Sequence, residues 1–272
     1  MFTMLFSQDC SSEESATHGI AARYIVPGCF QNYNELIAIQ STKVGGVSKG
    51  CYSSLNLGNN TGDWPELVQQ NMELLCKTLN ICPKRIVSSV QVHATRILRA
   101  EKPGHYHGYD AFITDQENLF LCILTADCYP ILLYDPRHKA SGAAHAGWKG
   151  TAGEIVKKTM AAMQKSFGTN PEECIVSIGT GITAGAYEVG HDVASAFHPD
   201  YSMRLSHLPE DEKYQLNLKM ANYHQLLDAG VPAPNIECSP FCTFRDSDLF
   251  YSFRRDQGVT GRMVSLIGVT SL

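Results

Sequence analysis

The fold is indicated most directly by residues 119–150, which read LFLCILTADCYPILLYDPRHKASGAAHAGWKG. Apolar runs at 119–125, 130–134 and 141–145 follow one another with few polar residues between them, as is typical of strands buried in a sheet. Outward from this stretch, similar runs predict further strands at 36–42, 86–92, 110–114 and 174–181, and two strands around a polar turn within 250–269.

Amphipathic segments predict helices at 64–80, 151–167 and 216–230. Strands and helices alternate along the whole chain, which favours an α+β (mixed α/β) class with two packed mixed sheets or one large sheet, flanked by helices. We interpret residues 36–272 as a single catalytic domain and 1–35 as an N-terminal segment that can belong to the same domain.

Composition and charge argue against several classes of function. The chain has 272 residues and a formal net charge of −5, so it has no basic field for nucleic acid or anionic membranes. No apolar run approaches the roughly 20 residues that span a bilayer, and the N-terminus lacks a signal-peptide pattern. The ten cysteines are then expected to be thiols rather than disulfides. We expect a cytoplasmic enzyme.

His93, Cys128 and His145 each lie at the end of a predicted strand, where a core would place an apolar side chain. Two imidazoles and a thiolate can hold a zinc ion and leave a fourth position open, as in catalytic zinc sites. The three residues are far apart in sequence, so they can meet only if their strands converge. Asp127, beside Cys128, is a candidate general base or a residue that orients a ligand.

Cationic residues near glycine-rich turns are candidates for binding phosphate, because lysine and arginine neutralise it and arginine can bind it in a bidentate manner. One stretch, STKVGGVSKG, lacks the residue order of a P-loop. A helix start after His145 offers free N–H groups to an anion. The candidates are Lys43, Lys149, Arg254, Arg255 and Arg262, of which Lys43, Arg254 and Arg255 are also catalytic candidates together with Asp127 and Cys128.

Several strings resemble the YfiH/DUF152 family, also called the laccase-domain or polyphenol oxidase family. They include GGVSKGCYSSLNLG, QVH, DAFITD, TADCYPILLYDP, AAHAGWKGTAGEIV, CTFRDSDLFYSFRRD and TGRMVSLI, and they extend from about Ile39 to Leu266. The resemblance implies a fold of sandwiched β-sheets flanked by helices. It also implies a zinc ion bound by His93, Cys128 and His145.

The resemblance further implies activity on purine nucleosides: phosphorolysis of adenosine, guanosine or inosine with inorganic phosphate, deamination of adenosine, and cleavage of methylthioadenosine. The chain departs from the family pattern twice, with Lys43 in place of an arginine and with Ile178-Gly179-Thr180-Gly181-Ile182 in place of I-G-P-C-I. We expect metal binding to persist and substrate preference to be affected.

Other functions stay open. Cys128 and His145 would also suit a cysteine hydrolase, for example one acting on cell-wall peptide precursors. A copper-dependent polyphenol oxidase is disfavoured because the chain lacks histidine-rich clusters, so copper is an unlikely cofactor. A non-catalytic zinc-binding protein is the last alternative. The sequence does not indicate the oligomeric state.

Overall fold

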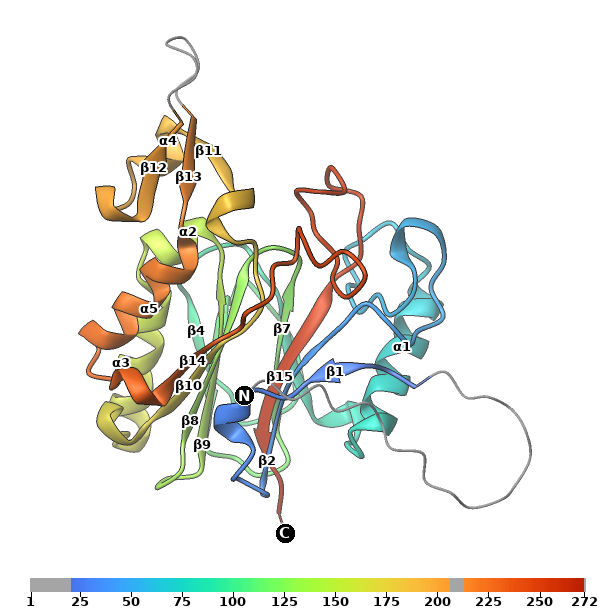
Figure 1. Ribbon diagram of the computed structural model, residues 1–272. Coiled ribbons are helices and arrows are strands. Elements are labelled where there is room, and N and C mark those ends of the chain that lie inside the picture. The colour runs from blue at the N-terminus through green and yellow to red at the C-terminus, as the bar shows by residue number, and fades with distance from the viewer. Residues whose placement is uncertain (1–20, 206–212, 272) are drawn as a thin grey trace.

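The computed structural model describes residues 21–205 and 213–271, where two six-stranded sheets lie face to face with helices on both outer sides (Figure 1). The first sheet has the order β1-β2-β15-β7-β3-β5 and the second β14-β10-β8-β9-β6-β4. Both contain parallel and antiparallel pairs. The prediction of an α+β fold with packed mixed sheets is confirmed.

The strands of the first sheet are β1 (Tyr24–Ile25), β2 (Leu36–Ser41), β3 (Ile86–Val90), β5 (Gly104–His107), β7 (Phe120–Thr125) and β15 (Met263–Val269). Those of the second are β4 (Ile97–Arg99), β6 (Ala111–Thr114), β8 (Tyr129–Asp135), β9 (Ala140–Ala146), β10 (Ile175–Ile178) and β14 (Ile236–Cys238). A small antiparallel sheet is formed by β11 (Glu188–Gly190), β12 (Ser202–Arg204) and β13 (Lys213–Leu216).

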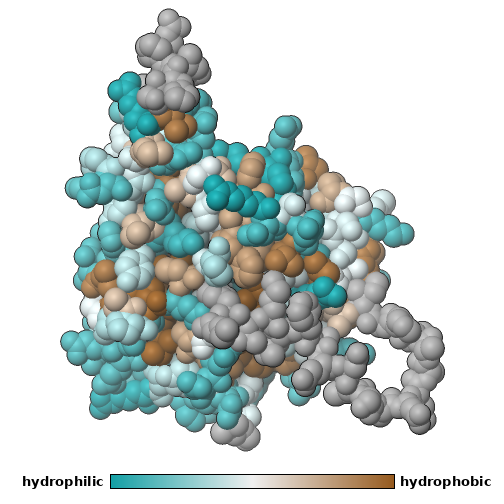
Figure 2. Space-filling model, in the orientation of Figure 1, coloured by the Kyte–Doolittle hydropathy of each residue, from teal (hydrophilic) through white to brown (hydrophobic). Residues whose placement is uncertain are grey.

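Helix α1 (Pro65–Thr78) covers the outer face of the first sheet, and α3 (Ile155–Phe167) and α5 (Leu218–Asp228) cover that of the second (Figure 1). The short helices α2 (Trp148–Ala152) and α4 (His191–Ala194) complete the five α-helices of the described residues. None of these helices is long and apolar enough to cross a membrane. Hydrophilic side chains predominate on the face shown in Figure 2, with small hydrophobic groups among them.

Strand β8 shows why the central runs are apolar throughout. Successive side chains of a strand point to opposite faces. Ile131 and Leu133 pack on the helix side of the sheet, whereas Leu132 and Tyr134 pack between the two sheets. Both faces of the strand are therefore buried, so its sequence shows no alternation of apolar and polar residues.

Two sequence expectations need correction. The helix predicted at 151–167 is divided, because Glu154 has a left-handed backbone (φ 59°) between α2 and α3. The strand predicted near 250–253 does not form. Its backbone closes turns instead: the N–H of Phe250 donates to the carbonyl of Asp246, and the N–H of Gly258 to that of Phe253. Only β15 is a strand in this part of the chain.

The N-terminal segment is only partly described. Residues 1–20 lie outside the described part, but β1 pairs with β2 as the edge of the first sheet. The described part of this segment is therefore built into the same sandwich as the rest of the chain.

Candidate metal centre

His93, Cys128 and His145 meet at one end of the sandwich. His93 follows β3 of the first sheet, Cys128 lies in the turn from β7 to β8, and His145 is near the end of β9. One ligand atom from each residue lies within 4.8 Å of the others, and the Cys128 Sγ is 3.9 Å from the His93 Nε2. The structure therefore brings together the trio that the sequence singled out, close enough for one ion to reach all three.

Asp110, immediately before β6, contacts both histidine segments. Its Oδ1 accepts the Nδ1–H of His145 at 2.9 Å, which leaves the His145 Nε2 free for a ligand. The same carboxylate accepts the backbone N–H groups of Val92, His93 and Ala94. Burial alone would raise the pKa of Asp110, but these hydrogen bonds lower it.

Gly147 leaves the space that the trio occupies. A Cβ at this position would lie 2.9 Å from the Cys128 Sγ and 3.0 Å from the His93 Cδ2. Its backbone has an ordinary φ of −77°, so the glycine is required for space and not for conformation. Together with the free His145 Nε2, this space shows that the residues present fit a metal ion bound by two imidazoles and a thiolate.

The electrostatics of the trio favour a charged pair when no metal is bound. Burial opposes the thiolate, but His145 and His93 outweigh it and lower the pKa of Cys128 to about 6. Burial likewise opposes the His145 imidazolium, but Cys128 and Asp110 raise its pKa to about 9. A metal ion would take the place of the proton that His145 then carries.

The turns that carry His93 and Cys128 both contain unusual backbone. His93 has φ 58° and Asp127 has φ 91°, a region that residues other than glycine rarely adopt. The Asp127 carboxylate stabilises its turn, because it accepts hydrogen bonds from the Thr243 hydroxyl at 2.6 Å and from the backbone N–H of Arg254 at 2.7 Å. Strained backbone of this kind concentrates at functional sites.

Gly181, within the stretch that departs from the family pattern, packs against this turn. A Cβ there would lie 2.8 Å from the carbonyl oxygen of Asp127 and 2.9 Å from the ring of Tyr129. The stretch that differs from the family pattern therefore contacts the turn that carries Cys128, and lies closer to the trio than the sequence suggests. The backbone found here accepts glycine and excludes a larger residue.

The trio opens into a cavity of about 440 Å³. Aromatic side chains provide flat apolar walls, and two arginines provide positive charge. The main lining residues are Asn60, Gln91, Trp148, Tyr187, Phe253, Arg254 and Arg262.

Of the five cationic candidates, Arg254 and Arg262 line this cavity. Arg262 is half-buried, stacks over the Phe253 ring at 5.5 Å, and donates from one Nη to the carbonyls of Thr260 and Gly261. Burial lowers the pKa of Arg262, whereas the charges of Cys128 and Asp127 oppose that change. Arg254 is exposed and donates to the carbonyl of Glu188.

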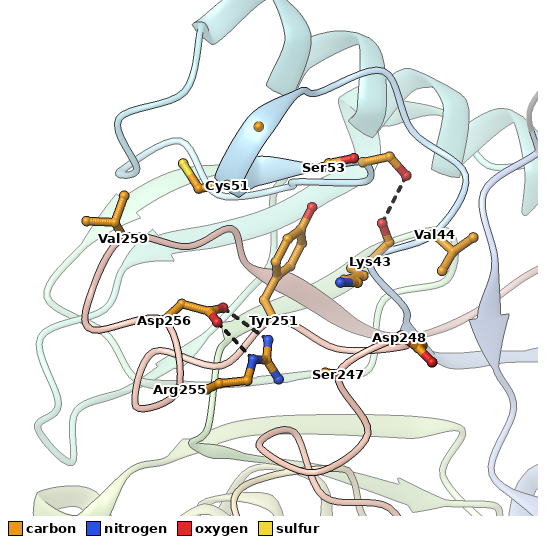
Figure 3. A pocket seen from close by; sticks show the side chains of 12 residues that line it. Lys43, Val44, Cys51, Ser53, Ser247, Asp248, Tyr251, Arg255, Asp256 and Val259 are labelled. Carbon is orange, nitrogen blue, oxygen red and sulfur yellow. Dashed lines mark hydrogen bonds and ion pairs between the residues drawn. The ribbon is translucent and has the colours of Figure 1, made fainter.

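Lys43 and Arg255 lie elsewhere, around a second cavity of about 690 Å³ (Figure 3). Arg255 pairs with Asp256 and also donates to the carbonyls of Thr243, Phe244 and Phe250. Its guanidinium therefore holds the loop together. Lys149 is exposed, with its Nζ 5.5 Å from the Trp148 ring, and does not line the trio's cavity.

Sequence reasoning overlooked Asp110 and Gly147. Asp110 had a detectable signal, since it is an acid directly before the apolar run AFIT, where an unpaired carboxylate would be costly. Gly147 had none, because the need for space depends on His93, which is distant in sequence.

Comparison with known proteins identifies the family of this chain. Residues 37–270 match the family model described as "Multi-copper polyphenol oxidoreductase laccase". A protein of Deinococcus radiodurans named "Purine nucleoside phosphorylase" is 38% identical over 84% of this chain and 87% of its own. One of Bacteroides thetaiotaomicron with the same name is 36% identical over 86% and 92%.

Solved structures give the same result. The crystal structure of YlmD from Geobacillus stearothermophilus superposes with a TM-score of 0.86 at 32% identity, covering 99% of this chain and 100% of its own. That of YfiH from Bacillus licheniformis has a TM-score of 0.84 at 31% identity, covering 93% and 97%. The chain therefore belongs to the YfiH/DUF152 family, whose sequence model carries the laccase description.

Proposed function

We propose that this protein is a zinc-dependent purine nucleoside phosphorylase, which converts adenosine, guanosine or inosine and inorganic phosphate to the free base and ribose-1-phosphate. The names of the relatives support the reaction class. The observation that carries the proposal is that the His93–Cys128–His145 trio, the half-buried Arg262 and three aromatic rings share one cavity. Such a cavity combines an apolar wall for a purine with positive charge for phosphate.

In phosphorolysis a phosphate oxygen forms a bond to the ribose C1′ while the bond from C1′ to the base nitrogen breaks. The incoming phosphate needs its charge neutralised beside the sugar. We assign this role to Arg262, because it is half-buried and lines the same cavity as the trio. Arg254 stands exposed on the same cavity and would help to attract the anion.

The aromatic side chains of Trp148, Tyr187 and Phe253 offer flat surfaces to a purine. The Arg262 guanidinium already stacks on Phe253, which keeps that ring and that charge together. Asp127 uses both carboxylate oxygens to hold Thr243 and Arg254. This arrangement favours an orienting role for Asp127 over that of a general base.

His93, Cys128 and His145 would hold the metal ion. When bound, the ion would act as a Lewis acid that polarises an oxygen of the substrate. We assign zinc because two imidazoles, one thiolate and an open position suit it. Among the described residues, the trio is the one group of histidine, cysteine or acidic side chains placed to hold an ion. A multi-copper enzyme requires more than one such group.

We extend the proposal to adenosine deamination and to phosphorolysis of methylthioadenosine. The same cavity would serve all three reactions, since the purine walls and the trio are common to them. The finer selectivity depends on which groups face the base, and Asn60 and Gln91 are polar side chains that line the cavity.

The test is a nucleoside panel, with and without phosphate, on protein whose metal content has been measured. We expect free base and ribose-1-phosphate only when phosphate is present, inosine from adenosine without it, and about one zinc per chain. Cys128→Ala should abolish bound zinc and both activities. Cys51→Ser is the matched control, because Cys51 is an exposed thiol outside this cavity. Full activity in zinc-free Cys128→Ala would exclude the proposal.

A cysteine hydrolase acting on peptide precursors of the cell wall is the second candidate. The metal-free pair of a Cys128 thiolate and a His145 imidazolium favours it, because this is the charge state of an activated cysteine nucleophile. A metal-free enzyme that resists chelators, is inactivated by alkylation and leaves nucleosides intact would support this candidate.

A further inference from the structure

We propose that Asp110 is a positioning residue that holds both histidine ligands, His93 and His145, in the geometry that binds metal. The inference rests on the metal centre of the proposed function. Asp110 does not line the cavity of the trio and is not one of the three residues that would hold the ion, but its hydrogen bonds organise those residues.

Asp110 holds the loop that carries His93. Three successive backbone N–H groups, from Val92, His93 and Ala94, donate to the two oxygens of Asp110 at 2.9 to 3.2 Å. His93 itself has the left-handed φ of 58°. That conformation is costly for a residue with a Cβ, so it persists only where its surroundings enforce it. The carboxylate supplies the matching acceptors.

Asp110 also orients the ring of His145. Its Nδ1 lies 2.9 Å from the Asp110 Oδ1, and both side chains are almost fully buried. A carboxylate accepts hydrogen bonds and cannot donate them, so the Nδ1 must carry the proton. The nitrogen that would bind the metal is then the Nε2, and the ring is fixed in orientation.

Asp110 also links the two sheets of the sandwich. It precedes β6 of the second sheet, whose backbone pairs with β9, and the carbonyl of Asp110 accepts the N–H of His145. The loop it holds follows β3 of the first sheet. One carboxylate thus ties a ligand from each sheet, so the distance between the two histidines depends on it.

The chain offers a matched control at the opposite end of β8. Asp135 is also buried, accepts the Nδ1–H of His138 at 2.8 Å, and accepts two backbone N–H groups. Replacing it with asparagine removes a similar network without touching the trio. Any effect common to both variants would reflect general loss of a buried carboxylate.

The experiment measures zinc affinity by competition with a chromophoric chelator in wild type, Asp110→Asn and Asp135→Asn. Removal of such a supporting carboxylate typically weakens metal binding about 10- to 100-fold. We expect that loss in Asp110→Asn and an unchanged affinity in Asp135→Asn. Equal affinity in all three, or equal loss in both variants, would overturn the inference. Failure of wild type to bind zinc would overturn the proposed metal centre and this inference with it.

A second measurement needs no variant and applies even if Asp110→Asn does not fold. Nitrogen NMR of the zinc-loaded wild type reports which ring nitrogen of His145 carries the proton. We expect a protonated Nδ1 that exchanges slowly with solvent. A protonated Nε2, with zinc on the Nδ1, would show that Asp110 does not orient this ligand while leaving zinc binding itself established.

Discussion

Gly147 and Cys128 are in such close contact that a single methyl group on the glycine would fall 2.9 Å from the cysteine sulfur. Carbon and sulfur atoms do not approach this closely without displacement. The Gly147→Ala variant should therefore move Cys128 or His93, lower zinc affinity at least tenfold and abolish nucleoside turnover. Because the φ of Gly147 suits alanine, the thermal midpoint of the metal-free protein should fall only by what this local overpacking costs. Zinc titration and thermal melting check both expectations, and unchanged affinity would contradict the placement of the trio.

Arg262→Gln should raise the KM for phosphate by tenfold or more, because it removes the half-buried charge beside the trio. Lys43→Gln is the matched control, since Lys43 faces the second cavity. Steady-state kinetics at varied phosphate separate the two. A larger effect in Lys43→Gln would move the phosphate site to the second cavity.

Arg255→Ala should act on stability more than on substrate binding. The guanidinium holds the carbonyls of Thr243 and Phe250 and the carboxylate of Asp256. Their loss should lower the free energy of unfolding by about 2 to 4 kcal/mol, as for removal of a partly buried, charged hydrogen-bond network. Urea unfolding measures this change. A variant of normal stability with impaired phosphate binding would instead make Arg255 a ligand residue.

Removal of zinc should expose a reactive thiol. In the metal-free protein the pKa of Cys128 is lowered to about 6, against about 8.5 for an ordinary thiol. The thiolate forms as the pH rises through the pKa, so the rate of alkylation should increase between about pH 5 and 7 and level off above it. Peptide mapping after iodoacetamide treatment identifies the site. Zinc should protect Cys128, and alkylation that is equally fast with zinc would contradict its role as a ligand.

The sequence singled out the trio because all three residues interrupt apolar runs at predicted strand ends, and the structure brings the three together. The sequence did not show which of the five cationic candidates lie near the trio. Arg254 and Arg255 are adjacent, yet one lines the cavity of the trio and the other bonds the loop that it belongs to. Adjacent residues of an irregular loop follow no fixed periodicity, so the direction of each side chain depends on which backbone carbonyls are near.

The same reason explains the strand expected near 250–253. Phe250 and Tyr251 are buried aromatic residues, which favour a strand by composition. Their backbone groups instead close turns with neighbours such as Asp246. A buried loop and a buried strand both appear in the sequence as an apolar run, so the run alone does not distinguish them.

The sequence by itself determined that strands buried on both faces would form, and that His93, Cys128 and His145 would stand at their ends, because alternation and residue chemistry are local properties. The tertiary structure alone decided that these ends meet across two sheets, that Asp110 joins His93 to His145, and that Gly147 leaves room for the sulfur. Those relationships depend on the register and packing of strands distant in sequence, which no local pattern encodes.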